Sequence, residues 1–239
     1  MHSPFVFDLL TKCFYDKRKY PEYEILKSYR NELLRNKDTI EVTDFGVGSK
    51  VFNSDTRAIH QIAKNAGISG QRAQLLFRIM RYFKPESVLE LGTSLGLAAQ
   101  ALALGNKNSV ISTLEGCAAT AKIAQIQFAL FDLNNINSFT AEFKTYLNSS
   151  ALASNKFQLI YFDGNHSEAA TLHYFKSLLP TICNETVWIF DDIHWSKDME
   201  NAWETIKNHP EVIVTIDTFH WGFVFFRKEQ KKEHFVIRT

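Results

Sequence analysis

The chain has 239 residues, 45% of them hydrophobic and 22% charged, which is typical of one globular domain with a sizeable core. The 27 Lys and Arg residues against 26 Asp and Glu residues give a net charge of +1, which disfavours a protein that binds nucleic acid through a broad basic field. No apolar run reaches the roughly 20 residues that span a bilayer, and charges interrupt the N-terminus where a signal peptide would continue apolar, so we expect a cytoplasmic protein without a membrane partner.

The first third of the chain shows helical rather than strand-like patterning. Apolar residues recur at helical spacing over Tyr23–Asn36 and again over Arg72–Phe83. Between them, the glycine-containing segment Thr43–Asn53 is either a plain loop or a cradle whose backbone N–H groups hold an anion. We expect an N-terminal helical extension over residues 1–70 and a main domain over residues 71–239.

From about residue 85 onward, short β-branched or aromatic runs alternate with amphipathic stretches, which predicts an α/β fold with a mostly parallel sheet and helices on both faces. The last two expected strands are separated only by Thr218–Trp221, too few residues for a crossover helix, so we expect them to form an antiparallel hairpin. The expected strands are Ser87–Leu91, Ser109–Leu114, Ser138–Phe143, Phe157–Phe162, Val187–Phe190, Val212–Asp217 and Gly222–Arg227.

The sharpest local signal is a strand, a glycine turn and an Ala-rich helix over Ser87–Ala103. The strand ends at Glu90 and Leu91, the turn begins at Gly92, and the helix begins near Gly96. Such a turn presents free N–H groups at the carboxyl edge of the sheet, where open α/β sheets bind ligands. The sequence lacks the glycine pattern of a P-loop and the GxGxxG pattern of dinucleotide-binding proteins, which disfavours an enzyme that uses a nicotinamide cofactor.

The next expected strand is followed by Glu115, which lies 115 − 96 = 19 residues after Gly96. This spacing is close to that at which a carboxylate receives the hydroxyls of a ribose in nucleotide-binding sheets. The alternative is a solvated Glu that stabilises the positive end of the following helix.

Two later strands also end on carboxylates, Asp163 after the fourth strand and Asp191 and Asp192 after the fifth. Three carboxylates at one sheet edge repel one another unless a cation or protons compensate their charge, and Mg²⁺ is the simplest compensating ion. The alternative is that these side chains cap a helix and accept hydrogen bonds from a turn.

Histidines follow both acidic strand ends. His166 lies three residues after Asp163 and His194 two residues after Asp192, so we expect the two imidazoles to bracket the ion. A neutral His can accept a proton near pH 7, and His166 is the candidate base, although a loop His is also consistent with polar surface. Trp195 and Trp221 are candidates for the wall of a substrate pocket, or for residues packed under their loops.

The chain carries the ordered set ELGTSLG, Glu115, FDGNH, IFDD and the final hairpin. Over roughly residues 70–228 this set resembles a class I S-adenosylmethionine-dependent methyltransferase. Within that superfamily the set is most similar to cation-dependent O-methyltransferases of the catechol, caffeoyl-coenzyme A and macrocin types. The resemblance implies a Rossmann-like seven-stranded sheet of order 3-2-1-4-5-7-6 with strand 7 antiparallel. It also implies that the N-terminal extension forms a lid over the cofactor.

The resemblance further implies site roles by position. The methionine part of the cofactor would contact Glu90, Gly92, Thr93 and Gly96. Its ribose would bind Glu115, its adenine would lie near Glu142, and Asp163 would also lie beside the cofactor. Asp163, Asp191 and Asp192 fall on metal positions, and His166 stands where the catechol type has a Lys base.

These observations predict an S-adenosylmethionine-dependent methyltransferase that acts on a small-molecule hydroxyl with the help of Mg²⁺. One alternative is a metal-independent N-methyltransferase acting on a small molecule, a protein or RNA. Another is a protein that binds S-adenosylmethionine without catalysis. The sequence leaves open whether the chain forms a homodimer.

Overall fold

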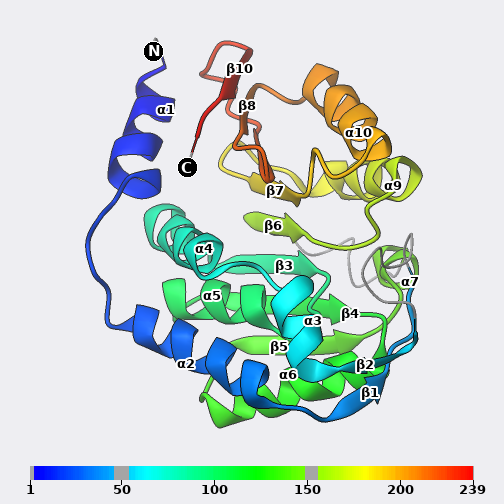
Figure 1. The fold of residues 1–239 in the computed structure, drawn as a ribbon. Coiled ribbons are helices and arrows are strands. Elements are labelled where there is room, and N and C mark those ends of the chain that lie inside the picture. Colours follow the sequence, from blue (N-terminus) through cyan, green and yellow to red (C-terminus); the bar gives the residue numbers. More distant parts are fainter. Residues whose placement is uncertain (1–2, 46–53, 149–155, 239) are drawn as a thin grey trace.

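The computed structural model describes residues 3–45, 54–148 and 156–238. None of the described helices combines the length and the apolar character that crossing a membrane requires. The elements (Figure 1) are α1 Pro4–Leu9, a π-helical turn Leu10–Phe14, α2 Glu22–Arg35, β1 Thr39–Glu41, β2 Thr56–Ala58, α3 Ile59–Asn65, α4 Gly70–Phe83, β3 Ser87–Leu91, α5 Leu97–Gly105, β4 Val110–Glu115, α6 Ala118–Leu130, β5 Ile136–Thr140, α7 Phe143–Leu147, β6 Leu159–Phe162, α9 Glu168–Leu178, a 3₁₀ turn Leu179–Thr181, β7 Val187–Asp191, α10 Lys197–Asn208, β8 Val214–Asp217, β9 Trp221–Phe225 and β10 Glu233–Val236.

The fold is α/β, with a mostly parallel central sheet of eight strands in the order β10-β8-β9-β7-β6-β3-β4-β5. β9 runs antiparallel to both of its neighbours, β7 and β8, so the predicted hairpin is confirmed. Read from β5 to β8, the seven predicted strands follow the predicted order 3-2-1-4-5-7-6. The predicted number of strands is corrected, because the described sheet contains an eighth strand, β10. This strand begins within the charge-dense segment RKEQKKEH of residues 227–234 and pairs in parallel with β8 at the sheet edge, where alternate residues of the strand are exposed.

The third predicted strand is also shifted. β5 ends at Thr140, whereas the sequence predicts a strand continuing to Phe143. Phe143 instead begins the short helix α7, with Glu142 as the residue that precedes it. The aromatic residues on both sides of this turn produce a strand-like pattern that the backbone does not follow.

Helices cover both faces of the sheet. Successive side chains along a strand point to opposite faces and therefore enter two different hydrophobic cores. On β6, Leu159 and Tyr161 join a core formed with the N-terminal helices, α4 and α5. Ile160 and Phe162 join a second core formed with α7, α9 and α10. This two-sided burial explains the continuous apolar runs of the central strands.

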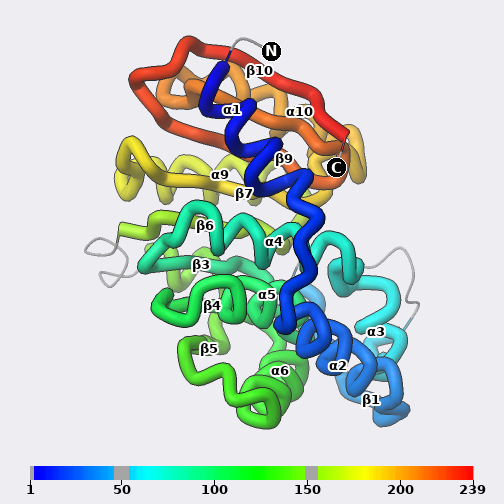
Figure 2. Tube along the Cα trace, turned by 90° about the vertical axis from the view of Figure 1, so that its left-hand side faces the viewer, coloured from blue at the N-terminus to red at the C-terminus, as the bar shows by residue number. Residues whose placement is uncertain are grey.

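The N-terminal segment packs across the sheet toward the C-terminus. The ring of Phe5 lies 5.0 Å from that of Phe225, and the Tyr15 hydroxyl donates to the Arg238 carbonyl at 2.9 Å. Figure 2 shows α1 crossing beside β9 and β10, while α2 and α3 lie beyond the opposite end of α4. The N-terminal residues therefore contact two separate regions of the sheet, and α2 and α3 lie near the turn after β3.

Candidate active site

The turn after β3 is built around Gly92, which has a positive φ of 106°. A Cβ at this position would overlap the backbone carbonyl of Asp163, so only glycine lets the ends of β3 and β6 approach so closely. The turn is fixed by the Gly92 N–H, which donates to the Leu114 carbonyl at 2.9 Å, and by the Ser94 N–H, which donates to Glu115 Oε2 at 2.8 Å. Three strand ends thus meet at one point, as the sequence predicts.

Glu90 lies directly beneath this turn and is fully buried. The Thr113 hydroxyl donates to its Oε2 atom, and its Oε1 atom has no hydrogen-bond partner among the described residues. Burial, with a smaller contribution from the charge of Glu115, raises the pKa of Glu90 to about 8. The unpaired oxygen of this buried carboxyl group is suited to a cationic hydrogen-bond donor such as an ammonium group, whose charge would favour the ionised form.

Thr93 and Gly96 complete the turn. The Thr93 hydroxyl lies 2.5 Å from that of Thr113, and Gly96 precedes α5 with a φ of 81°. A side chain on Gly96 would meet the Tyr29 hydroxyl of α2, which donates to the Leu95 carbonyl at 2.9 Å. α2 therefore packs directly against the turn.

Glu115, at the end of β4, accepts backbone N–H groups with both oxygens, from Ser94 and from Cys117 at 2.9 Å. Burial raises the pKa of this carboxyl group, while these N–H bonds oppose the shift. The Ala141 N–H donates to the Glu115 backbone carbonyl at 3.0 Å, which places Glu142 at the adjacent strand end. The predicted ribose and adenine positions are therefore neighbours at the carboxyl edge of the sheet.

The three predicted aspartates lie together. The Tyr161 hydroxyl lies 3.0 Å from Asp191 Oδ2 and 3.4 Å from Asp163 Oδ2, and the Asp192 N–H donates to Asp191 Oδ1 at 2.8 Å. Burial and the neighbouring carboxylates raise the pKa of Asp163 well above its usual range. The pKa of Asp192 is raised for the same two reasons.

A cation not foreseen from the sequence lies against this cluster. Arg72, in the first turn of α4, places its Nη1 atom 3.2 Å from Asp191 Oδ1. The helix begins beside it because the Ser69 side chain accepts the Arg72 N–H at 3.2 Å. Arg72 thus supplies positive charge at the place where the sequence predicts a metal ion.

One of the three residues at the predicted Mg²⁺ site, Asp191, already has several partners within the protein. Both oxygens of Asp191 are already occupied, one by Arg72 and the Asp192 N–H, the other by Tyr161. Within the described part of the chain, no three His, Cys, Asp or Glu side chains converge as a metal site requires. The expectation that Asp163, Asp191 and Asp192 jointly hold Mg²⁺ stays a prediction, and the Arg72 guanidinium already compensates part of the carboxylate charge.

The two histidines separate. His166 Nε2 lies 3.6 Å from Asp163 Oδ1, so His166 does face the acidic cluster. His194 instead places its Nε2 atom 2.7 Å from Asp217 Oδ2, on the neighbouring hairpin. The expectation that both imidazoles bracket one site is wrong, since Asp217 at the end of β8 attracts His194 away from Asp192.

The two tryptophans also differ. Trp221 is 1% exposed and packs edge-on against Tyr161 with ring centroids 5.8 Å apart, so it is a core residue and not a pocket wall. Trp195 is half-buried, and its ring lies 6.0 Å from that of His166. Only Trp195 is placed to contact a ligand beside His166.

Segments before α4 cover the site. Ile62 and Ala63 of α3 line a small cavity together with Gly92 and Asp163. Phe45 packs over Gly116, and its carbonyl accepts a hydrogen bond from Asn165 at 3.3 Å. No sequence pattern signals these contacts, since they depend on how the N-terminal helices pack. The predicted anion cradle at Gly46 and Gly48 lies outside the described residues.

Comparison with known proteins agrees with this geometry. Residues 89–193 match the profile of a family described as a methyltransferase domain. A Podospora anserina methyltransferase solved with bound SAH (S-adenosylhomocysteine) has a TM-score of 0.65 at 14% identity, covering 95% of this chain and 97% of that one. A Bacillus cereus O-methyltransferase in complex with SAH has a TM-score of 0.57 at 18% identity, covering 92% and 95%.

A third similar structure is the O-methyltransferase TomG of Streptomyces achromogenes, involved in tomaymycin synthesis and solved with SAM, with a TM-score of 0.60 at 12% identity and coverage of 93% and 95%. No curated protein matches the chain by sequence. At these identities the neighbours establish the fold. Together with the matched domain, they support a transferase enzyme with a class I methyltransferase fold.

Proposed function

We propose that the chain is an S-adenosylmethionine-dependent methyltransferase that acts on a hydroxyl group of a small molecule. The observation that carries the proposal is the Gly92 turn, in which a buried Glu90 with an unpaired oxygen underlies the site and the matched methyltransferase domain spans the surrounding residues. The structurally similar proteins solved with SAM or SAH support this cofactor.

The residues at the turn suit the parts of this cofactor. Glu90 would bind the methionine ammonium group through Oε1, and the backbone at Gly92, Thr93 and Gly96 would lie against the methionine chain. Glu115 retains acceptor capacity for the ribose hydroxyls, and Glu142 is at the strand end where the adenine would lie. Bound S-adenosylmethionine would supply an electrophilic methyl group on a positively charged sulfur.

Asp163 and His166 form the acceptor side of the proposed site. The acceptor oxygen would form a bond to the methyl carbon as the sulfur–methyl bond breaks, with S-adenosylhomocysteine as the leaving group. The proton of the acceptor hydroxyl would pass to His166. Asp163, 3.6 Å from His166, would stabilise the resulting imidazolium ion. The main contribution of the site is to hold the two reactants in line and away from water.

Arg72 takes the place of a divalent cation in this proposal. It neutralises Asp191, and Tyr161 connects Asp191 to Asp163, so the carboxylates are held without further ligands. We therefore propose a transfer that needs no added metal. The reason is that Arg72 already compensates the charge of Asp191.

Residues 1–70 would act as a lid in this proposal. α3 faces Gly92 and α2 holds the Leu95 carbonyl through Tyr29, so movement of these helices would open or close the turn. The rest of the chain, residues 71–239, would form the cofactor-binding domain.

The proposal is tested by incubating the full chain with isotopically labelled S-adenosylmethionine and panels of phenols, aliphatic alcohols and amines, in EDTA and in Mg²⁺. We expect labelled methyl ethers, at equal rates with EDTA and Mg²⁺. Labelled amines in place of ethers would favour the N-methyltransferase. Binding of the cofactor with no product from any panel would favour a binding protein without catalysis, and a requirement for Mg²⁺ would contradict the role given to Arg72.

A further inference from the structure

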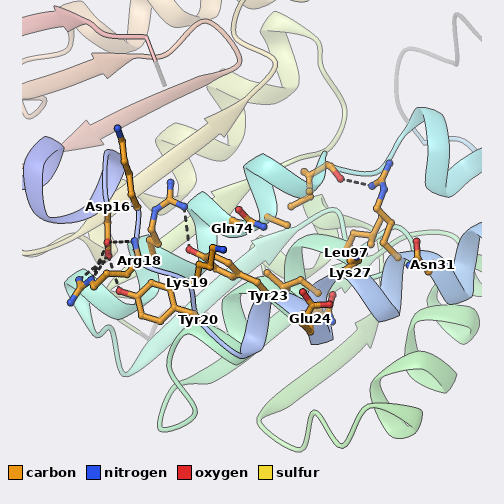
Figure 3. Close-up of a pocket in the computed structure, with 18 residues that line it drawn as sticks. Asp16, Arg18, Lys19, Tyr20, Tyr23, Glu24, Lys27, Asn31, Gln74 and Leu97 are labelled. Carbon is orange, nitrogen blue, oxygen red and sulfur yellow. Dashed lines mark hydrogen bonds and ion pairs between the residues drawn. The ribbon is translucent and has the colours of Figure 1, made fainter.

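A second cavity, separate from the strand-end carboxylates, lies between the segment before α2, α2 itself and the adjoining faces of α4 and α5. Its volume is about 540 Å³, within the range of roughly 300–1,000 Å³ that is usual for small-molecule sites. Figure 3 shows Tyr23, Glu24 and Lys27 of α2 along this cavity, with Gln74 of α4 and Leu97 of α5.

The walls of the cavity are basic. Lys17, Lys19 and Lys27 lie on its exposed side, and Arg30 and Arg78 lie deeper. Among the wall residues, the carboxylate of Glu24 forms no ion pair with any described residue. A second acid, Asp16, is already paired with Arg18 at 2.7 Å and accepts the Tyr20 hydroxyl. Since the whole chain has a net charge of only +1, this excess of positive charge is a local feature.

The two arginines are partly buried and bind neutral groups only, among the described residues. Arg30 donates to the Ile68 carbonyl at 2.6 Å, and Arg78 donates to the Cys13 and Phe14 carbonyls and to the Tyr23 hydroxyl. Carbonyl oxygens orient a guanidinium but leave its charge uncompensated, which is costly where water is partly excluded. Burial and the charge of Arg72 accordingly lower the pKa of Arg30.

The unused donors favour a particular ligand chemistry. Arg30 spends one hydrogen bond on Ile68, so most of its N–H donors remain for a ligand. Guanidinium groups bind the oxygens of phosphate in paired hydrogen bonds, and lysines at the mouth add point charges. We propose that this cavity binds a small molecule that carries two or more phosphate groups.

The cavity adjoins the turn after β3. Ile68 and Leu97 line both this cavity and the small cavity at Gly92 and Asp163, so the two share a wall. A phosphate group held there belongs either to the acceptor molecule or to a separate effector. The binding test uses neither S-adenosylmethionine nor an acceptor, so it can fail or succeed independently of the proposed function.

The test is a calorimetric titration of inorganic tripolyphosphate into the full chain at physiological salt. The test variant is Lys17→Gln/Lys19→Gln/Lys27→Gln, and its charge-matched control replaces three exposed lysines elsewhere, Lys64→Gln/Lys107→Gln/Lys122→Gln. Because all six side chains are exposed, both variants should keep the native unfolding temperature. We expect one bound anion per chain, with affinity at least tenfold weaker in the test variant and unchanged in the control.

The proposal would be overturned if tripolyphosphate does not bind to the native chain. It would also be overturned if the two variants lose affinity equally, since equal losses would reflect net charge alone. Steady-state kinetics with an acceptor found by the panel then separate the two sources. Inhibition by tripolyphosphate that is competitive with the acceptor supports a phosphate carried by the acceptor. A change in kcat without competition supports an effector at the same cavity.

Discussion

The guanidinium of Arg72 lies 3.2 Å from the carboxylate of Asp191 at the carboxyl edge of the sheet. One residue comes from the first turn of α4, and the other from the end of β7, more than a hundred positions later in the chain. Their contact converts a repulsive group of three aspartates into a partly neutralised network with Tyr161. It also ties the helix before β3 to the strand that carries the acidic cluster.

Arg72→Gln should therefore destabilise the fold. Removing one partner leaves Asp191 charged and buried, which costs about 3 kcal/mol in the free energy of unfolding. Adding Asp191→Asn removes the unpaired charge and should recover at least half of this loss. Urea unfolding of the two single variants and the double variant measures the coupling between the residues. Strictly additive losses in the double variant would show that the pair does not interact.

Gly92→Ala should be among the most damaging single substitutions in the chain. The positive φ and the overlap with the Asp163 carbonyl together predict a loss of about 3 kcal/mol or more in unfolding free energy. Gly70→Ala is the matched control, because a Cβ at Gly70 meets no atom within 4 Å and α4 begins there. We expect Gly70→Ala to be neutral or stabilising by up to about 1 kcal/mol. Thermal unfolding distinguishes the two, and equal effects would contradict the close approach at Gly92.

Glu90→Gln should change how stability depends on pH. The pKa of Glu90 is raised to about 8 in the folded chain, so the folded state holds a proton that the unfolded state has released from about pH 5 upward. The contribution of Glu90 to stability therefore falls as pH rises from about 5 to 8 and is constant above that range. Relative to the native chain, Glu90→Gln should gain about 1 kcal/mol per pH unit across this window. A difference in unfolding free energy that does not vary with pH would contradict this ionisation.

His166→Gln and His194→Gln should separate catalysis from packing. Loss of the proposed base at His166 is expected to lower kcat by about 10²-fold or more. His194 pairs with Asp217, so its replacement should affect stability by about 1 kcal/mol and leave kcat nearly unchanged. Rates with an acceptor from the panel, measured from pH 5 to 9, test both, and equal losses of kcat would remove His166 from the role of base.

Local patterns in the sequence were sufficient to predict the central strands and turns of the fold. The glycine turn at Gly92, the strand-end acids and the reversed β9 follow from spacing and from apolar runs that need no knowledge of distant contacts. The strand β10 escaped prediction because it begins in the charge-dense segment of residues 227–234, which is typical of a solvated surface, and because its pairing with β8 is a tertiary contact.

The sequence predicted where the acidic residues of the candidate site lie, but not which group neutralises their charge. Asp163 and Asp191 could be placed at one edge from their strands, yet Arg72 lies on a helix whose sequence shows only an amphipathic pattern. Whether a carboxylate is neutralised by a metal ion, a proton or a guanidinium depends on packing between elements that are remote in sequence. The basic cavity was likewise not predictable, because its residues come from elements that are remote in sequence: Arg78 from α4 and Lys17 from the segment before α2.

The proposed cofactor site is tested first by a calorimetric titration of S-adenosylhomocysteine into the full chain, in EDTA and again in excess Mg²⁺, with Glu90→Gln as the comparison. We expect one molecule to bind per chain with the same affinity in both buffers, and with at least tenfold weaker affinity in Glu90→Gln. No binding to the native chain, or binding only in Mg²⁺, would contradict this expectation.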